Sequence, residues 1–281
     1  MSEIDLHLHS TASDGRFSPA DIVRKAAERG LTVIALADHD TVDGIVPALA
    51  AAKTFPQLKV IPCVEISTDV PDGEAHILGY FVDYTDPEFA TRLERMRRSR
   101  QGRAQGMISK LRDSGIHIEW QRVQELADSG AIGRPHLAQA MLEKGYITSI
   151  KEAFTRYIGR GGPAYVGREK MAAVEAVALI VRADGLPVLA HPFTVSDPES
   201  LVIELKAAGL VGIEAYYNGY TTDAIDQLVD LADRHNLITT GGSDYHGLDD
   251  SAETMIGDTE TSVASAEQLI ALAEQRAQTV S

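Results

Sequence analysis

The sequence has one cysteine and no long apolar run. Cys63 stands alone, so an intrachain disulfide is impossible, and its place in the run KVIPCVEI predicts a buried strand residue. No apolar stretch approaches the roughly 20 residues of a membrane-spanning helix. The first residues show neither the basic nor the apolar segment of a signal peptide. These absences predict a protein of the reducing cytoplasm without a membrane partner.

Positive charge is scarce as well. The chain carries 26 Lys and Arg against 41 Asp and Glu, a formal net charge of −15 at pH 7. Because such a chain repels phosphate, duplex DNA is not an expected partner unless a local basic region overrides the net charge. Bound cations would neutralise part of the acid excess.

Short apolar runs alternate with helical patterns over most of the chain. In the first helical pattern, Ser18 can cap the N-terminus, Pro19 suits the first turn and Gly30 ends the helix. Further helices are expected near residues 42–54, 171–184, 198–208, 222–235 and 265–277. Since the strands between them are apolar on both faces, the pattern predicts a parallel α/β sheet, open or closed into a barrel. Functional groups then belong at the C-terminal ends of the strands.

Residues 86–165 break this alternation, because they read as consecutive helices without a strand. We therefore expect one barrel built from residues 1–90 and 166–281. Residues 91–165 are expected to form an inserted helical subdomain that caps the substrate.

The start of this insertion is basic in an otherwise acidic chain. Residues 92–112 hold eight of the 26 Lys and Arg: Arg92, Arg95, Arg97, Arg98, Arg100, Arg103, Lys110 and Arg112. The run fits the solvated face of a helix. It also fits a track for the backbone of an oligonucleotide, and the sequence leaves both interpretations open.

Histidines and carboxylates gather where the predicted strands end. His7 and His9 lie two residues apart, so they share one face of the first strand, together with Asp5. The ends of later strands carry His39, Glu65, His191, Asp244 and His246, and Asp14 follows the first strand. His76 begins its strand, but a hairpin over the turn-rich DVPDGEA would bring it beside Glu65.

Six histidines and three carboxylates are too many ligands for one ion. The candidate ligands are His7, His9, Asp14, His39, Glu65, His76, His191, Asp244 and His246. They suit a cluster of two or three ions with Glu65 as a bridge. A mixed imidazole and carboxylate shell fits zinc, manganese or iron better than magnesium or calcium.

The motifs HLHS with SDG, DHD, CVEIS, AHP and SDYH, in this order, resemble the PHP (polymerase and histidinol phosphatase) family over most of the chain. The resemblance implies a distorted (β/α)7 barrel with a trinuclear metal centre. Mn²⁺ is the expected metal, and Zn²⁺ or Fe²⁺ would be compatible. By this resemblance, one metal takes His7, His9, Glu65 and Asp244. A second takes Asp14, His39 and His246, and a third takes Glu65, His76 and His191.

Clustered metals would lower the pKa of a bridging water. The expected nucleophile is therefore a metal-bridging hydroxide held by Glu65, Asp244 and His246, which attacks phosphorus in line with the leaving oxygen. Asp38 and Asp40 flank His39. We expect them either to orient imidazoles or to be plain polar residues at a strand end.

The segments GRPHLA, YIGRGGPAYV and EAYYN resemble a short-chain group of the same family. That group hydrolyses nucleoside 3',5'-bisphosphates, such as adenosine 3',5'-bisphosphate, to AMP and phosphate, and some relatives trim short RNA from the 5' end. The predicted substrate contacts are Arg134, His136, Arg160 and Asn218. The arginines would hold the second phosphate, although surface charge, a helix-start histidine and a turn asparagine are the simpler interpretations. Phe193, Tyr216 and Tyr217 could stack a base or belong to the core.

The predicted function is thus a metal-dependent phosphohydrolase that removes the 3'-phosphate from nucleoside 3',5'-bisphosphates. One alternative is a 5'-to-3' exoribonuclease on short RNA. Another is a histidinol-phosphate phosphatase, whose cationic substrate would call for an acidic pocket in place of the arginines. A metal-stabilised scaffold without turnover would be expected to lack some of the ligands.

Overall fold

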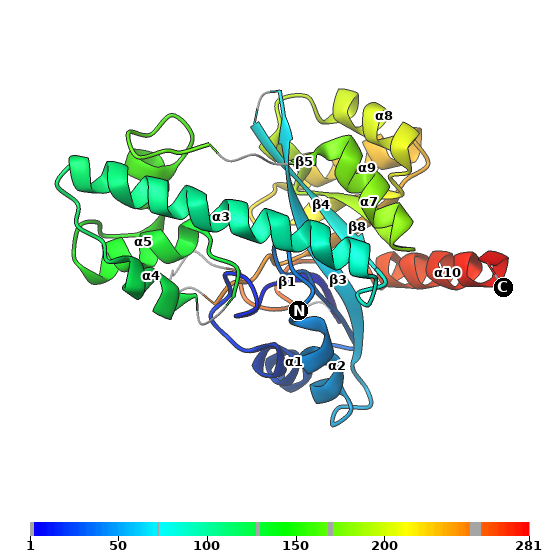
Figure 1. Cartoon of the computed structure of the whole chain (residues 1–281). Coiled ribbons are helices and arrows are strands. Elements are labelled where there is room, and N and C mark those ends of the chain that lie inside the picture. Colours follow the sequence, from blue (N-terminus) through cyan, green and yellow to red (C-terminus); the bar gives the residue numbers. More distant parts are fainter. Residues whose placement is uncertain (1–2, 72, 128–129, 168–170, 248–253, 281) are drawn as a thin grey trace.

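The computed structural model describes residues 3–71, 73–127, 130–167, 171–247 and 254–280. One sheet forms a nearly closed barrel, with the strand order β1-β2-β3-β4-β6-β7-β8 (Figure 1). These strands are β1 (Ile4–Leu8), β2 (Val33–Leu36), β3 (Lys59–Val70), β4 (Gly73–Tyr80), β6 (Leu186–Ala190), β7 (Gly212–Tyr217) and β8 (Ile238–Gly242). The short strand β5 (Met171–Ala172) pairs with β3 outside this path. The prediction of an α/β barrel is confirmed.

The barrel closes between β1 and the segment after β8. Asp244 N–H donates to the carbonyl of His7 at 2.9 Å, and His9 N–H donates to the carbonyl of Tyr245 at 3.0 Å. Gly242 permits this approach, because a Cβ there would lie 2.5 Å from the Cβ of His7. The closure brings the first and last metal-ligand motifs of the sequence together.

Strand β4 is the exception to the parallel arrangement, since it runs antiparallel to both β3 and β6. The β3–β4 hairpin pairs Glu65 with Leu78 and Ser67 with His76. His76 Nδ1 accordingly lies 2.7 Å from Glu65 Oε1, as the hairpin prediction requires.

Helices cover the outside of the barrel. They are α1 (Pro19–Glu28), α2 (Ile45–Ala52), α7 (Ala173–Arg182), α8 (Pro198–Ala208), α9 (Thr222–Arg234) and α10 (Val263–Val280). The Ser18 side chain caps α1 by accepting from the N–H of Asp21, as predicted. No described helix is long and apolar enough to cross a membrane.

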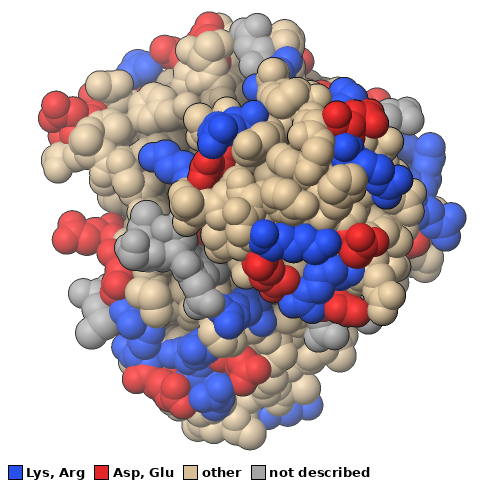
Figure 2. All heavy atoms as spheres, turned by 90° about the vertical axis from the view of Figure 1, so that its left-hand side faces the viewer, with Lys and Arg blue, Asp and Glu red and all other residues tan. Residues whose placement is uncertain are grey.

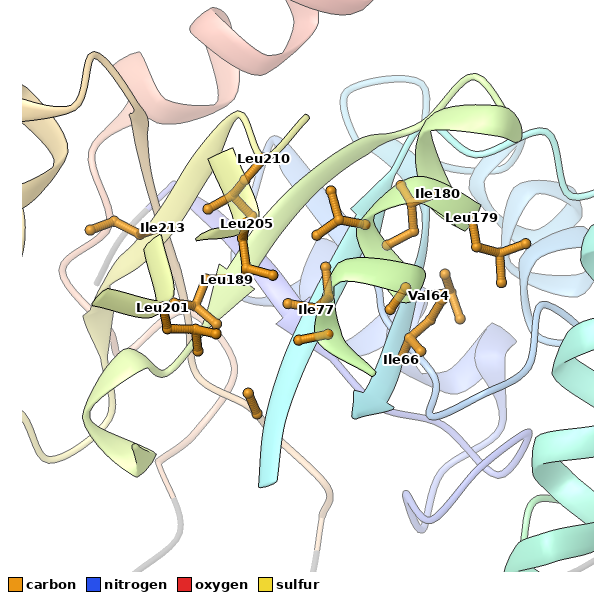
Figure 3. Packing of buried hydrophobic residues seen from close by; sticks show 14 of the residues in the cluster. Val64, Ile66, Ile77, Leu179, Ile180, Leu189, Leu201, Leu205, Leu210 and Ile213 are labelled. Atoms are coloured by element: carbon orange, nitrogen blue, oxygen red, sulfur yellow. The ribbon is translucent and has the colours of Figure 1, made fainter. Parts of the chain in front are cut away.

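The largest apolar cluster lies between the sheet and α7, α8 and α9. Figure 3 shows Val64 and Ile66 of β3 and Ile77 of β4 near Leu179 and Ile180 of α7. Val64 and Ile66 point out of the barrel toward α7. Cys63 and Glu65 alternate with them along β3, and Cys63 is fully buried, as predicted. Alternation along the strand therefore turns Glu65 away from the helices and toward the barrel.

Helices without strands fill the described part of residues 86–165. They are α3 (Pro87–Asp113), α4 (Trp120–Leu126), α5 (Arg134–Glu143), α6 (Ile150–Ala153) and a π-helical turn at Phe154–Ile158. The first half of α3 packs on the barrel cluster through residues that include Leu93 and Met96. Its second half joins a separate apolar cluster with α4, α5 and α6. Helix α3 thus runs from the barrel into the helical layer (Figure 1).

Candidate metal centre

The structure brings all nine candidate ligands to the C-terminal end of the barrel. His7 and His9 lie at the end of β1, Asp14 in the next loop, Glu65 in β3 and His76 in β4, and His39, His191, Asp244 and His246 follow β2, β6 and β8. The rings of His9 and His246 stack with their centroids 4.1 Å apart, and His76 lies 5.0 Å from His191. Residues from both ends of the sequence therefore form one cluster.

Glu65 is the central carboxylate of this cluster. Its Oε1 lies 2.7 Å from His76 Nδ1 and 3.1 Å from His191 Nε2. Its Oε2 lies 3.4 Å from Nε2 of His7, 3.4 Å from Nε2 of His9 and 2.9 Å from Nδ1 of His39. Burial raises the pKa of Glu65, but His39, His76 and His7 outweigh burial and hold that pKa well below its ordinary value. Each oxygen faces different imidazoles, which is the arrangement a bridging carboxylate needs.

The ligand atoms form three overlapping groups. Within each group, these atoms all lie within 4.8 Å of one another. The groups are His7, His9, Glu65 and Asp244; His9, Asp14, His39 and His246; and His39, Glu65 and His76. The first is the predicted set, and the second is the predicted set with His9 added. In the third group His39 takes the place that was expected for His191, although His191 still faces Glu65.

Several buried atoms of this cluster have no hydrogen bond of acceptable geometry. They are His7 Nε2, His9 Nδ1 and Nε2, Asp14 Oδ1, His39 Nδ1, Glu65 Oε2 and Asp244 Oδ1. Leaving so many buried polar atoms unpaired is costly, unless a cation binds between them. Imidazole and carboxylate donors together suit divalent transition-metal ions. The residues present thus form a cluster able to hold metal ions.

Three of the six described residues other than glycine with a positive φ lie at the same strand ends. Asp40, His191 and Asp244 have φ angles of 54°, 27° and 53°, in the left-handed region that residues other than glycine rarely adopt. Each such residue costs on the order of 1–3 kcal/mol, and such residues cluster at functional sites. The fold accepts this cost where the candidate ligands are presented.

Glu214 orients two of the imidazole-bearing residues and was missed by the sequence analysis. His7 Nδ1 donates to Glu214 Oε1 at 2.9 Å, and the backbone N–H of His191 donates to Oε2 at 2.9 Å. This bond directs the other ring nitrogen of His7 toward the cluster, the usual role of a carboxylate behind a metal-binding histidine. An acidic residue inside the apolar strand GIEAYY was the available signal.

The sequence left open whether Asp38 and Asp40 orient imidazoles or are plain polar residues at a strand end. Asp38 accepts hydrogen bonds from Ser10 and Ser13, so it shapes the loop that carries Asp14. The interpretation of Asp38 as an imidazole partner is wrong, because its carboxylate is used by this loop. Asp40 accepts from Ser67 N–H and Arg100 Nε.

Asp5 shares the strand face of His7 and His9, but it lies earlier in β1, further from the strand end that carries the cluster. It accepts hydrogen bonds from Ser243 N–H, the Ser243 hydroxyl and Gly257 N–H. Burial raises the pKa of Asp5 to about 6. Asp5 therefore joins β1 to the segments that follow β8.

A cavity of about 180 Å³ adjoins the cluster. Asp14, His39, His76 and His246 line one part of it, and Arg100, Arg103, Arg134 and Glu74 line another, with further residues from α3, α5 and the π-helical turn. Arg134 was a predicted substrate contact. The sequence analysis named Arg100 and Arg103 only as members of the basic run 92–112. In the structure both side chains are buried.

The basic run therefore has two kinds of residue. Arg92, Arg95, Arg98, Lys110 and Arg112 are exposed, and Arg97 is half-buried and pairs with Asp43 and Glu94. Arg100 and Arg103 fall on the same helical stripe as Leu93, Met96 and Met107, with spacings of three and four residues. That spacing was the sequence signal that these two arginines face inward.

The other predicted substrate residues lie outside the cavity lining. His136 is buried in α5, and its Nδ1 accepts from Gly133 N–H at 3.0 Å. Burial lowers the pKa of His136 to about 4, so the ring is neutral near pH 7 and carries its proton on Nε2. Arg160 is exposed, and Asn218 is half-buried after β7.

The three predicted stacking aromatics have separate environments. Tyr217 donates to Asp244 Oδ2 at 2.8 Å, which makes it a support of a candidate ligand. Tyr216 packs against the barrel cluster. Phe193 is 40% exposed, and its backbone N–H donates to the hydroxyl of Tyr220.

A nearly closed α/β barrel with a His/Asp/Glu cluster at its strand ends is the architecture of a metal-dependent hydrolase. The chain belongs to the PHP family, whose domain matches residues 5–159. It is 36% identical over 246 residues to a 5'-3' exoribonuclease of Haemophilus influenzae, covering 86% of this chain and 89% of the relative. It is 33% identical over 251 residues to a 3',5'-nucleoside bisphosphate phosphatase of Chromobacterium violaceum, covering 88% of each.

A solved structure supports the same assignment. A candidate metal-dependent phosphoesterase from Bifidobacterium adolescentis superimposes with a TM-score of 0.88 at 27% identity, covering 95% of both chains. This protein is thus a metal-dependent phosphoesterase of the PHP family, and the resemblance read from its motifs is confirmed.

Proposed function

We propose that this phosphoesterase removes the 3'-phosphate from nucleoside 3',5'-bisphosphates, such as adenosine 3',5'-bisphosphate, and leaves the 5'-nucleotide. One observation carries the proposal: a single cavity is lined both by candidate metal ligands and by Arg100, Arg103 and Arg134. A bisphosphate carries two phosphates on one ribose. Metal ions bound at the candidate ligands and the arginines would provide one cationic region for each phosphate.

The nine candidate ligands would hold two or three divalent ions, with Mn²⁺ expected and Zn²⁺ or Fe²⁺ compatible. Such ions supply a hydroxide from water near neutral pH and neutralise charge on the reacting phosphoryl group. Within the chain, Glu65 would bridge the ions, while Glu214 and Tyr217 hold His7 and Asp244 in place.

The arginines would bind the phosphate that does not react. Arg134 is partly exposed, Arg103 is buried, and both line the cavity, so their two planar guanidinium groups would face the incoming phosphate. Residues 91–165 supply this pair and, through Met107 and Phe154, part of the apolar lining. We therefore propose that this helical segment caps the substrate.

A 5'-to-3' exoribonuclease on short RNA is the second candidate. The same arginines would bind the 5'-phosphate of the RNA, while the phosphate of its first internucleotide bond reaches the metals. The exposed basic residues of α3 favour it. Figure 2, which shows the face formed by the helical layer, has Lys and Arg interspersed with Asp and Glu rather than in one continuous basic track. This distribution fits a nucleotide or a very short RNA. Histidinol phosphate fits poorly, since the cavity arginines repel its amine.

Phosphate release would test the proposal. Manganese-loaded protein is given adenosine 3',5'-bisphosphate, adenosine 5'-phosphate, histidinol phosphate and a 5'-phosphorylated RNA pentamer in parallel. We expect the bisphosphate to be hydrolysed fastest, with adenosine 5'-phosphate as the product. Preferred turnover of the pentamer or of histidinol phosphate would refute this substrate and leave the phosphoesterase class intact.

A further inference from the structure

A carboxylate occupies the arginine region of the cavity. Glu74 lies in β4 and lines the cavity. Arg134 Nη2 donates to Glu74 Oε2 at 2.9 Å, and Arg103 Nη2 donates to Oε1 at 3.4 Å. One carboxylate therefore joins the two guanidinium groups that the proposed function assigns to the second phosphate.

The strand sets the backbone spacing between Glu74 and the candidate ligand His76. Glu74 and His76 lie two residues apart on β4, so their side chains leave the same face of the strand. Two residues of a strand span about 6.7 Å. This backbone spacing is of the same size as the separation of the two phosphates on one ribose, so a phosphate at the metal ligands and a phosphate near Glu74 can belong to one nucleotide.

The charges around Glu74 favour a phosphate over a carboxylate. Arg103 is buried, and its Nε donates to the carbonyl of Val166 at 3.0 Å, so this guanidinium is held in place. Burial lowers the pKa of Arg103, and the nearby charge of Arg134 lowers it further. Two guanidinium groups share one carboxylate charge, whereas a phosphate monoester brings nearly two charges and three acceptor oxygens.

We propose that Glu74 is an internal counter-anion, which pairs with Arg103 and Arg134 in the substrate-free enzyme and is displaced by the terminal phosphate of the incoming nucleotide. The inference rests on the proposed function, because it identifies the occupant of the same arginine pair. A terminal phosphate competes with Glu74, whereas an uncharged hydroxyl does not. Glu74 thereby selects ligands that carry a phosphate at this end and weakens retention of the 5'-nucleotide product.

The test compares ligand binding by the wild type and by the Glu74→Gln variant, measured by titration calorimetry. The matched control is Glu94→Gln, which removes the same charge from a glutamate that pairs with Arg97 and Arg98 outside the cavity. The probes are adenosine 5'-phosphate, adenosine and inorganic phosphate. They are measured on the full chain as purified and again after chelation, so that phosphate binding at the arginines is separated from binding at metals. Thermal unfolding without ligand checks that each variant is folded.

We expect Glu74→Gln to bind adenosine 5'-phosphate about tenfold more tightly than the wild type, since a charged competitor for the arginines is lost. Adenosine binding and the Glu94→Gln variant should be unchanged. Equal, weaker or absent binding of both phosphate probes by folded Glu74→Gln overturns the inference, as does an equal gain for adenosine. If Glu74→Gln binds inorganic phosphate more tightly but neither protein binds adenosine 5'-phosphate, the role of Glu74 stands. The phosphate-release assay on adenosine 3',5'-bisphosphate then decides the nucleotide substrate separately.

Discussion

Arg100 Nε donates to Asp40 Oδ2 at 2.5 Å, and both side chains are buried. The pair joins α3 to the loop that follows β2. In that loop, Asp40 is the residue next to the candidate ligand His39. Arg100 Nη2 also donates to Ser67 Oγ at 2.6 Å, which extends the link to β3. The helical layer and the candidate metal centre are thus connected by a charged hydrogen-bond network.

Replacing Arg100 by Gln is expected to lower the free energy of unfolding by about 3–5 kcal/mol, because the buried Asp40 carboxylate loses its cation. Urea unfolding would measure the change. Arg98→Gln is the matched control, since the Arg98 side chain is 76% exposed and its loss should alter stability by no more than about 0.5 kcal/mol. Equal stability of the two variants would show that the Arg100 pair is not a structural link.

Glu65→Gln should remove at least one bound metal ion and reduce phosphatase activity by about 100-fold or more, because an amide is a poor bridge between cations. Elemental analysis of the purified protein gives the metal content. Glu267→Gln, on the exposed face of α10, should retain the full metal content. A Glu65→Gln protein with wild-type metal content and activity would contradict the central position assigned to this carboxylate.

Glu214→Gln tests the support behind His7. We expect metal affinity to fall about 10- to 100-fold, since the amide no longer holds the His7 ring as a charged acceptor. Competition with a chromophoric chelator measures the affinity. Unchanged affinity, in a variant whose unfolding midpoint matches the wild type, would mean that packing alone orients His7.

Chelation of the metals is expected to lower the melting temperature and to abolish activity. The buried imidazoles and carboxylates then face one another without a cation, and ligand-linked stability is lost. Differential scanning calorimetry before and after chelation, with re-addition of Mn²⁺, tests this expectation. A melting temperature that does not change on chelation and re-addition would indicate that metal binding is not coupled to stability.

Arg134→Met should raise the KM for adenosine 3',5'-bisphosphate about 10- to 100-fold while affecting adenosine 3'-phosphate much less, because only the bisphosphate carries the group that Arg134 would bind. Steady-state kinetics on the two substrates separates the effects. Arg156→Met, at a largely exposed arginine outside the cavity lining, is the control. Equal losses on both substrates would place the role of Arg134 in folding or in the reacting phosphate.

The strand positions of the candidate ligands were readable from the sequence, because alternation along a strand puts His7 and His9 on one face and parallel strands share one functional edge. The hairpin that brings His76 to Glu65 was readable from its turn residues. The helices of the barrel followed from caps and apolar spacing. These features depend on short-range chemistry, which a single sequence records.

The tertiary structure decided the contacts that depend on packing. Whether Arg100 and Arg103 face solvent or the cavity depends on which side of α3 lies against the barrel, and charge alone suggested solvent. The placement of β7 relative to β1 decides that Glu214 supports His7. The mutual distances among the ligand atoms decide that His39, rather than His191, shares a group with Glu65 and His76. Sequence by itself determined which chemical groups reach the barrel end, and only the packing of distant segments determined how they are paired.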